Sequence, residues 1–414
     1  MSAVPEPTAG VSTWPWAIRS LGHRNFRLYW AGQVTSLIGT WMGIVAQGWI
    51  VYELTHSPLM LGLVNFAALV PVVPVSLAAG VLSDRLPRRK LILVTEVVLM
   101  LQALTMAGLI WAGAIQVWHV ILLSFVLGAA AAVEQPARLA FVMDVVGRED
   151  LSNAVALNAS AYNTARIIGP VIAGLLIAAW GAAVCFFLNG VSFLAVIVAV
   201  LAIQPMTTFK VMAQERISAS LIDGFHYIWD ARLIRSLLLI VALSSFLTLP
   251  YIALMPAYAR DVVQAGPTGL GYLFTGVGIG AILGALVVAQ VHEGRRGEWL
   301  TIANILGPLS VLLFCFSRSL PLSLLLVVAI GTSNAIRQTL VNSLLQLNTQ
   351  DAYHGRVMSI FNLLFNGMSR VGALGVGALA EFAGVPSALG ASALLSIVVG
   401  LIVLVGMPHV RHMP

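Results

Sequence analysis

The sequence predicts an all-α membrane protein with twelve transmembrane helices in two six-helix bundles, related by a pseudo-two-fold repeat. Of its 414 residues, 59% are hydrophobic and only 9% are charged, which leaves too little charge for the surface of a water-soluble domain. Apolar runs of about twenty residues recur along the chain, the length that a helix needs to cross a bilayer. Backbone in lipid must satisfy its own hydrogen bonds, and runs of this length favour helices over barrel strands.

Hydropathy windows of about nineteen residues locate twelve apolar runs. They are expected to begin near Phe26, Pro58, Leu91, Trp118, Leu151, Ala182, Ile234, Thr268, Leu300, Pro321, Val357 and Pro386. The chain then divides into a cytoplasmic N-terminal segment (1–25), a first bundle (26–203), a cytoplasmic linker (204–232), a second bundle (233–407) and a cytoplasmic tail (408–414).

The linker between the two bundles is the longest polar connection. Its apolar residues Ile217, Leu221, Phe225 and Ile228 recur at helical spacing beside charged neighbours. This pattern predicts an amphipathic helix that lies on the inner surface of the membrane.

Basic residues indicate the orientation of the chain in the membrane. If the N-terminus is cytoplasmic, the outer loops hold only Arg260 and Arg318. The inner loops then hold Arg85, Arg88, Arg89, Lys90, Arg148, Lys210, Arg216, Arg232, Arg235, Arg295, Arg296 and Arg356. Because cytoplasmic loops carry an excess of Lys and Arg, both termini are predicted to be cytoplasmic. The net charge of +6 therefore reports topology, and no nucleic acid is expected as a partner.

The two halves repeat each other at a nearly constant spacing. Gly128, Gln135, Asn158 and Arg166 in the first half correspond to Gly331, Gln338, Asn362 and Arg370 in the second. Parallel repeats of this length predict two bundles that face each other around a central axis, with a substrate site near the membrane midplane. Rocking of one bundle against the other would alternate access to that site.

The loop between the second and third runs carries the most specific motif. It reads Gly80-Val-Leu-Ser-Asp84-Arg85-Leu-Pro-Arg88-Arg89-Lys90 and resembles the signature loop of the major facilitator superfamily. The resemblance implies a cytoplasmic gate formed by Gly80, Asp84, Arg85 and Arg88, and we expect Asp144 to be the partner of Arg88. The alternative is that this charge only sets the topology. The counterpart at residues 292–297 lacks the Asp-Arg pair, so any latch there should be weaker.

Residues 135–193 resemble one branch of that superfamily. Gln135-Pro136-Ala-Arg138, Gly169-Pro170 and Asn189 are similar to the enterobactin-exporter-like branch, also called transmembrane secretion effectors. The resemblance covers nearly the whole chain. It implies multi-pass insertion in a bacterial cytoplasmic (inner) membrane and secondary active export of amphipathic small molecules, either siderophores or drug-like compounds. The run from Gly169-Pro170 to Gly174 loosely resembles a shortened antiporter motif, which implies exchange with protons.

Polar stripes on the fifth and eleventh runs predict a substrate cavity. Ionised groups at the centre of a membrane helix cost roughly 2.5–3.5 kcal/mol, so Arg166 and Arg370 require a reason. Residues four apart lie on one side of a helix, which groups Asn158 and Tyr162 with Arg166, and Asn362 and Asn366 with Arg370. We expect the guanidinium groups to bind an anionic or carbonyl-rich substrate. The alternative is that each arginine binds backbone carbonyls within its own bundle.

Further polar residues inside the runs complete the expected cavity. They are Gln33, Thr40 and Gln47 in the first run, Tyr251 in the seventh, and Asn334 and Arg337 in the tenth. Polar side chains at these positions could instead bond neighbouring helices.

Glu134 is interpreted as the only carboxylate well inside a span of the first half, and hence as the proton-coupling candidate. A carboxyl group that loses its hydration binds a proton more readily, so it could load on one side and release on the other. The alternative is a permanent ion pair with Arg138 or Arg166.

Enzymatic chemistry is not expected. The sequence holds no phosphate-binding Gly-Lys-Ser or Gly-Lys-Thr loop, no His-Glu-x-x-His and no serine elbow, and its two cysteines have no metal-ligand spacing. We therefore expect no cofactor, an ion gradient as the source of energy, and a monomer with lipid, protons and a small amphipathic substrate as partners. A non-translocating sensor or assembly protein, and an importer or lipid transporter of the same fold, remain alternatives.

Overall fold

The computed structural model describes residues 15–72, 74–76, 86–203, 225–292 and 294–406. Within these ranges every regular element is helical. The first half contains η1 (Trp16–Gly22), α1 (Arg24–Thr55), α2 (Pro58–Ala67), α4 (Arg88–Trp111), α5 (Val117–Val146), α6 (Leu151–Trp180) and α7 (Ala182–Ala202). The second half contains α9 (Arg232–Leu247), α10 (Tyr251–Ala257), η2 (Tyr258–Val262), α11 (Gly266–Ala289), α12 (Arg296–Phe316), α13 (Leu320–Asn348), η3 (Asp351–Tyr353), α14 (His354–Ala383) and α15 (Val385–Gly406).

Eleven helices in the described part of the chain are long and apolar enough to cross a membrane, with α9, α10 and η2 forming one of them. Ten of them begin within four residues of the start predicted from hydropathy, and the span Asp351–Ala383 begins six residues before the start predicted at Val357. The remaining predicted span begins at Pro58, where α2 begins, and α2 ends at Ala67. Residues 77–85, which hold most of the loop expected after this span, lie outside the described ranges. Of the predicted linker helix, Ile217 and Leu221 also lie outside these ranges, whereas residues 225–230 are helical.

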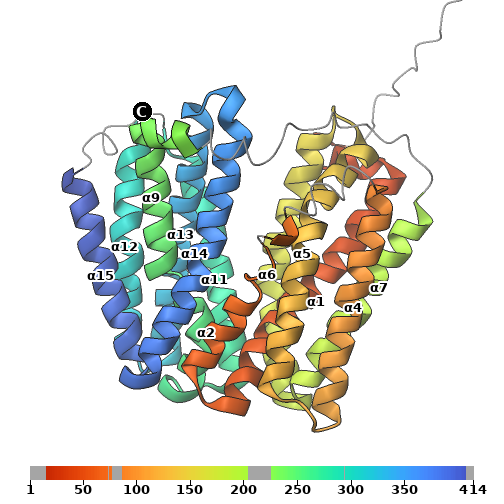
Figure 1. The fold of residues 1–414 in the computed structure, drawn as a ribbon, viewed down its shortest axis with the longest axis horizontal. Helices are drawn as coiled ribbons and strands as arrows, with labels where there is room; N and C mark the ends of the chain where they lie inside the picture. Colours follow the sequence, from red (N-terminus) through yellow and green to blue (C-terminus); the bar gives the residue numbers. More distant parts are fainter. Residues whose placement is uncertain (1–14, 73, 77–85, 204–224, 293, 407–414) are drawn as a thin grey trace, which may run out of the picture.

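The two halves form two bundles that lie side by side (Figure 1). The helices that make contacts between the two bundles follow the repeat. The second span of the first half, α2, packs against α14, the fifth span of the second half, and α11 packs against α6 in the equivalent way. Two equivalent helix pairs of this kind are expected when the halves are related by a pseudo-two-fold axis.

Glycines make the close contacts at this junction. A side chain at Gly62 or Gly377 would collide with backbone atoms of the facing helix in the α2–α14 pair, and the same holds for Gly174 and Gly271 in the α6–α11 pair. Within the bundles, Gly128 on α5 lies against the carbonyl of Ala68, and its repeat partner Gly331 lies against the carbonyl of Val277. Small residues allow helix backbones to approach where no hydrophobic force drives association.

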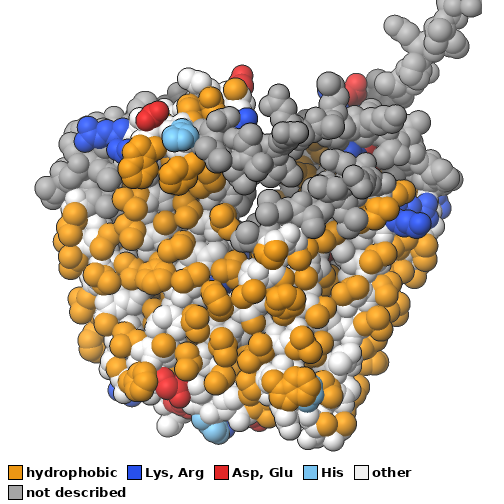
Figure 2. All heavy atoms as spheres, in the orientation of Figure 1, with side chains coloured by type: hydrophobic (Ala, Val, Ile, Leu, Met, Phe, Trp, Pro, Cys, Tyr) orange, Lys and Arg blue, Asp and Glu red, His pale blue; other side chains and the backbone are white. Residues whose placement is uncertain are grey.

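The flank of the molecule is covered by hydrophobic side chains, and charged side chains gather at its two ends (Figure 2). Large apolar residues are exposed along the helices, among them Leu101, Leu122, Val198, Leu286 and Phe382. An apolar belt of this kind suits contact with lipid.

The two ends differ in charge. We call the end at which α1, α4, α6, α9, α12 and α14 begin the basic face. Its described basic residues include Arg88, Arg89, Lys90, Arg148, Arg232, Arg235, Arg295, Arg296 and Arg356. The other end, where α2 and α11 begin, is called the opposite face and includes Arg260 and Arg318. Assignment of the basic face to the cytoplasm stays a prediction.

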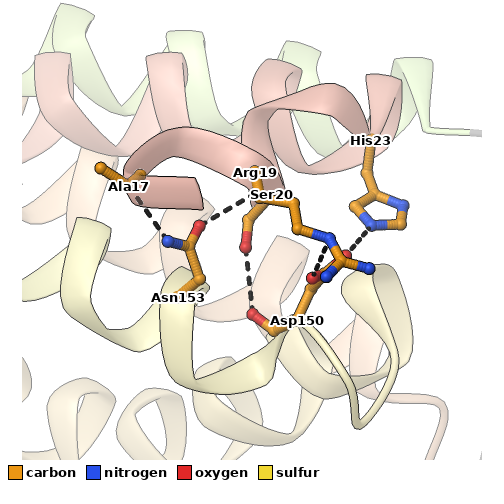
Figure 3. A network of polar contacts seen from close by, with 6 residues as sticks. All are labelled: Ala17, Arg19, Ser20, His23, Asp150 and Asn153. Carbon is orange, nitrogen blue, oxygen red and sulfur yellow. Dashed lines mark hydrogen bonds and ion pairs between the residues drawn. The ribbon is translucent and has the colours of Figure 1, made fainter. Parts of the chain in front are cut away.

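A polar network fastens η1 to the start of α6 at the basic face (Figure 3). The backbone N–H of Ser20 donates to Asn153 Oδ1 at 2.9 Å, and the Ser20 hydroxyl donates to the main-chain oxygen of Asp150 at 3.0 Å. The Asp150 carboxylate is bound by Arg19 at 3.1 Å and by His23 at 2.7 Å. Within the predicted N-terminal segment (1–25), η1 therefore packs against α1 and α6 of the first bundle.

Candidate functional site

Arg166, Arg337 and Arg370 lie inside membrane spans, and the described residues supply none of them with a carboxylate partner. Arg166 is on α6, Arg337 on α13 and Arg370 on α14. Arg166 lies over the ring of Trp41 on α1, with 5.8 Å between its guanidinium carbon and the ring centroid. Stacking of this kind orients a guanidinium but leaves its charge unneutralised.

Arg337 is almost fully buried, with 3% of its surface exposed. Its Nη2 donates to Asn334 Oδ1 on the same helix at 2.6 Å. A neutral amide satisfies one of the five guanidinium donors and does not cancel the charge. The burial of a charge without a counter-ion is costly, so the site is suited to a ligand that supplies one.

Tyr251 on α10 connects the two halves of this site. Its side chain is fully buried, and its hydroxyl has no hydrogen-bond partner among the described residues. The helix that carries it, α10, packs against α1 and α2 of the first half and against α11 of the second half. Tyr251 therefore lies near the junction of the bundles.

The predicted stripes on α6 and α14 are accessible from the side of the basic face. Tyr162 is 47% exposed and packs edge-on against Trp41 at 5.7 Å between ring centroids, while Asn158 is half-buried. On α14, Asn362 and Asn366 are exposed and Arg370 is half-buried. Further along, both helices are buried against the opposite half at the glycine contacts described above. The halves thus diverge toward the basic face, as the ribbon also shows (Figure 1).

The polar residues of α1 divide between two environments. Thr40 and Gln47 are half-buried. Gln33, which the sequence placed in the cavity, lies in the interior of the first bundle, with 3% of its surface exposed, and donates to Glu96 Oε1 at 3.5 Å. It therefore belongs to a second polar cluster.

This second cluster, which we call the acidic cluster, consists of Tyr29, Gln33, Glu96, Glu134 and Arg138. Glu134 forms an ion pair with Arg138, one turn along α5. Glu96 on α4 is fully buried, and its Oε1 lies 3.8 Å from Arg138 Nη2.

The interpretation of Glu134 as the only intramembrane carboxylate of the first half is wrong. Glu96 lies only five residues beyond the start expected for the third span at Leu91, close to the basic loop, so its depth could not be judged from hydropathy. The signal that could have identified it is its place inside an apolar run with no charged neighbour from Leu91 to Val98.

The repeat places Glu134 and Arg337 at equivalent positions, because each residue directly precedes one of the repeat partners Gln135 and Gln338. Both side chains are buried. The two halves thus carry opposite charges at the same depth of the fourth span of each bundle.

The ion pair expected between Arg88 and Asp144 is present. Arg88 Nη1 lies 2.5 Å from Asp144 Oδ1 and also donates to the main-chain oxygen of Ala140 at 3.2 Å. The pair is buried and joins α4 to α5 within the first bundle. Gly80, Asp84 and Arg85 lie outside the described residues, and the gating role of the motif stays a prediction.

Contacts that join the two halves at the opposite face were not predicted. The Tyr52 hydroxyl on α1 donates to the carboxylate of Asp261 on η2. Glu381 Oε2 on α14 accepts from the Ser57 hydroxyl at 2.6 Å and from the Leu59 N–H at 3.2 Å. We call these contacts the opposite-face latch. Their partners lie more than 200 residues apart in the chain, which hydropathy and local spacing cannot detect.

A metal centre has no support in the described part of the chain, where no group of three His, Cys, Asp or Glu side chains could hold an ion. Cys185 and Cys315 are both free and buried.

Comparison with known proteins agrees with this architecture. A family model described as "Transmembrane secretion effector" matches residues 14–413. The chain is 25% identical over 391 residues to the multidrug efflux pump Tap of Mycolicibacterium fortuitum, covering 92% of this chain and 95% of that protein. It is 26% identical over 403 residues to the enterobactin exporter EntS of Escherichia coli O9:H4 (strain HS), covering 95% and 94%.

A solved structure supports the fold alone. A bacterial homologue of the human lysosomal transporter Spinster, in an inward-facing and unoccupied conformation, matches with a TM-score of 0.71 at 12% identity and covers 97% of each chain.

Proposed function

Because this chain belongs to the transmembrane secretion effector family of the major facilitator superfamily, we propose that it exports amphipathic small molecules in exchange for protons by alternating access. It is an efflux or secretion transporter of the major facilitator type. One of its relatives is named a multidrug efflux pump and another an enterobactin exporter. The substrate and the coupling ion of this chain are the parts that go beyond family membership.

The observation that carries the substrate proposal is a set of arginines to which the described residues supply no carboxylate partner. Arg166 and Arg337 lie in opposite halves of the chain, and Arg370 is the repeat partner of Arg166. A ligand with a carboxylate, or with several phenolate or carbonyl oxygens, would satisfy donors that the protein leaves open. Trp41 and Tyr162 offer aromatic surface beside Arg166 for the apolar part of such a ligand.

The orientation follows from charge. We place the protein as a multi-pass protein of the bacterial cytoplasmic membrane with the basic face inward, since cytoplasmic loops carry the excess of Lys and Arg. The polar stripes of α6 and α14 then open to the cytoplasm, and the opposite-face latch closes the route to the outside. This arrangement is suited to loading a substrate from inside the cell.

The gate motif is assigned a role on the inner side. The buried pair of Arg88 and Asp144 fixes the start of α4 to the end of α5. In the sequence, Gly80, Asp84 and Arg85 belong to the loop that precedes α4. We place the cytoplasmic gate of the transporter in this loop.

Transport into inverted vesicles tests the function. Purified protein is reconstituted with a proton gradient, acidic inside, and supplied with fluorescent amphiphiles that match in size and differ in charge. Gradient-dependent accumulation that is strongest for the anionic probe is the expected result. Binding without accumulation would identify a non-translocating sensor, and accumulation without any response to the gradient would exclude proton exchange. Equal accumulation of cationic and anionic probes would contradict the role of the arginines.

A further inference from the structure

We infer that the acidic cluster holds one exchangeable proton, and that Glu96 rather than Glu134 is the residue that carries it. This inference rests on the proposed proton coupling and deepens it by assigning the site. The cluster lies inside the first bundle, where α1, α4 and α5 meet, and contains two carboxylates and a single guanidinium.

The charge balance of the cluster requires a proton. With both Glu96 and Glu134 ionised, one negative charge would remain uncompensated among buried groups, at a cost of several kcal/mol. Gln33, which donates to Glu96, is neutral. Tyr29 lies one turn before Gln33 on α1, and its hydroxyl has no hydrogen-bond partner among the described residues. On α7, which packs against α4, the only titratable group in residues 182–202 is Cys185. One proton bound to either carboxylate restores neutrality.

The geometry decides which carboxylate takes the proton. Arg138 binds Glu134 directly, whereas Glu96 Oε1 lies 3.8 Å from the same guanidinium, beyond hydrogen-bond distance. Glu96 Oε2 is buried and accepts no hydrogen bond from any described residue. A carboxylate with an open oxygen and a longer contact to the shared counter-ion is the better base, so Glu96 is the protonated member when the cluster is loaded.

The step itself is a simple proton transfer. A hydronium ion gives its proton to Glu96 Oε2 and leaves a water molecule, and Arg138 then pairs with Glu134 alone. When the proton returns to water, Glu96 becomes negative and attracts the guanidinium, which is shared between both carboxylates. The Arg138 side chain is 31% exposed although Glu96 is fully buried. It therefore connects the hidden carboxylate to the accessible surface of α5, where Gln135 and Leu139 are exposed.

The pair of variants Glu96→Gln and Glu134→Gln tests the assignment. Glu96→Gln removes the proton carrier and leaves the Glu134–Arg138 pair intact. Glu134→Gln frees Arg138 to bind Glu96, which then stays ionised. Both variants should lose gradient-driven accumulation of the anionic probe and keep substrate-for-substrate exchange, which moves no net protons. Glu298→Gln is the matched control, because Glu298 is an exposed carboxylate paired with Arg295 at the surface.

Infrared difference spectroscopy across a pH titration gives a readout that does not depend on transport. The carbonyl band of a protonated carboxylic acid should be present in the purified wild-type protein and in Glu298→Gln, and absent in both cluster variants. A wild-type band that persists in Glu96→Gln would overturn the assignment, even if transport is proton-coupled. A third outcome is a band that disappears in Glu96→Gln, together with probe accumulation that does not respond to the proton gradient. This outcome would overturn the proposed proton-coupled function but leave the assignment of the proton site intact. Absence of the band in the wild type would overturn the inference directly.

Discussion

The Ser57 hydroxyl at the start of α2 donates a 2.6 Å hydrogen bond to the Glu381 carboxylate at the end of α14, in the other half of the chain. The same carboxylate oxygen accepts the Leu59 N–H, so one side chain caps a helix of the opposite bundle. Together with the pair formed by Tyr52 and Asp261, it holds the halves together at the opposite face. Export requires this latch to break once in each cycle.

Glu381→Ala should therefore favour opening at the opposite face. Loss of its two hydrogen bonds removes about 1 kcal/mol from the closed state, a roughly fivefold change in the population of open molecules. Thr275→Cys reports on this opening, since Thr275 on α11 donates to the Ile167 carbonyl of α6 across the junction at 2.9 Å. Its labelling by a water-soluble maleimide should accelerate in the presence of Glu381→Ala. Glu53→Ala, which removes an exposed carboxylate of α1, is the control and should label at the starting rate.

Arg166→Gln and Arg370→Gln should each weaken binding of an anionic amphiphile by about tenfold, equivalent to about 1.4 kcal/mol. The reason is the loss of a positive charge that the protein does not neutralise itself. Fluorescence titration of purified protein measures the effect, and a neutral probe of the same shape should bind nearly unchanged. Arg318→Gln removes an equal charge from an exposed site and serves as the control. Unchanged affinity in both cavity variants would assign these arginines a packing role.

Breaking the buried pair of Arg88 and Asp144 should be costly. Arg88→Leu or Asp144→Leu alone leaves an uncompensated buried charge, at a cost of about 3–5 kcal/mol in the free energy of unfolding. Thermal unfolding in detergent should show both losses and a substantial recovery in the double variant. A transport assay of the double variant separates a gating role of the pair from a structural one. Recovery of stability without recovery of efflux supports a gating role. Recovery of both supports a structural role.

Gly331→Ala should destabilise the protein, because the new methyl group would lie 2.5 Å from the carbonyl oxygen of Val277. A methyl group at Gly108 on α4 would meet no atom within 4 Å, so Gly108→Ala should stabilise the helix by about 0.5–1 kcal/mol. Thermal unfolding of the two variants therefore should move in opposite directions. Parallel shifts would show that helix propensity, and not close packing, decides the effect.

Asp150→Ala should release η1 from α6. The substitution removes the acceptor of both Arg19 and His23. It leaves the hydrogen bonds of η1 with Asn153 and with the main-chain oxygen of Asp150, and the packing of η1 against α1 and α6. Limited proteolysis with trypsin should then cleave faster at Arg19, while Asp230→Ala, which removes an exposed carboxylate, leaves the rate unchanged. Equal cleavage in both variants would contradict a fastening role for this network.

Local properties of the sequence were sufficient to predict the spans. An apolar run of about twenty residues has one low-energy structure in lipid, so the helix starts at Leu151, Ala182 and Leu320 were predicted to within one residue. The pairing of Arg88 with Asp144 was also predicted, because both lie at the same end of neighbouring spans. The opposite-face latch and the burial of Glu96 depend on how distant helices pack, and no local pattern encodes that packing.

The junction between the halves has a mechanical consequence. At Gly62, Gly174, Gly271 and Gly377 the facing helices touch through backbone atoms, and no side chain of one helix is inserted into the other at these points. Interlocked side chains would have to change rotamers one by one before two helices could separate. Backbone surfaces of this kind can part and close again as rigid bodies at these four points. Elsewhere along the junction the Pro256 ring lies against Gly48 and the Ile167 side chain lies against Gly278, so separation of the halves there requires apolar side chains to leave their glycine contacts.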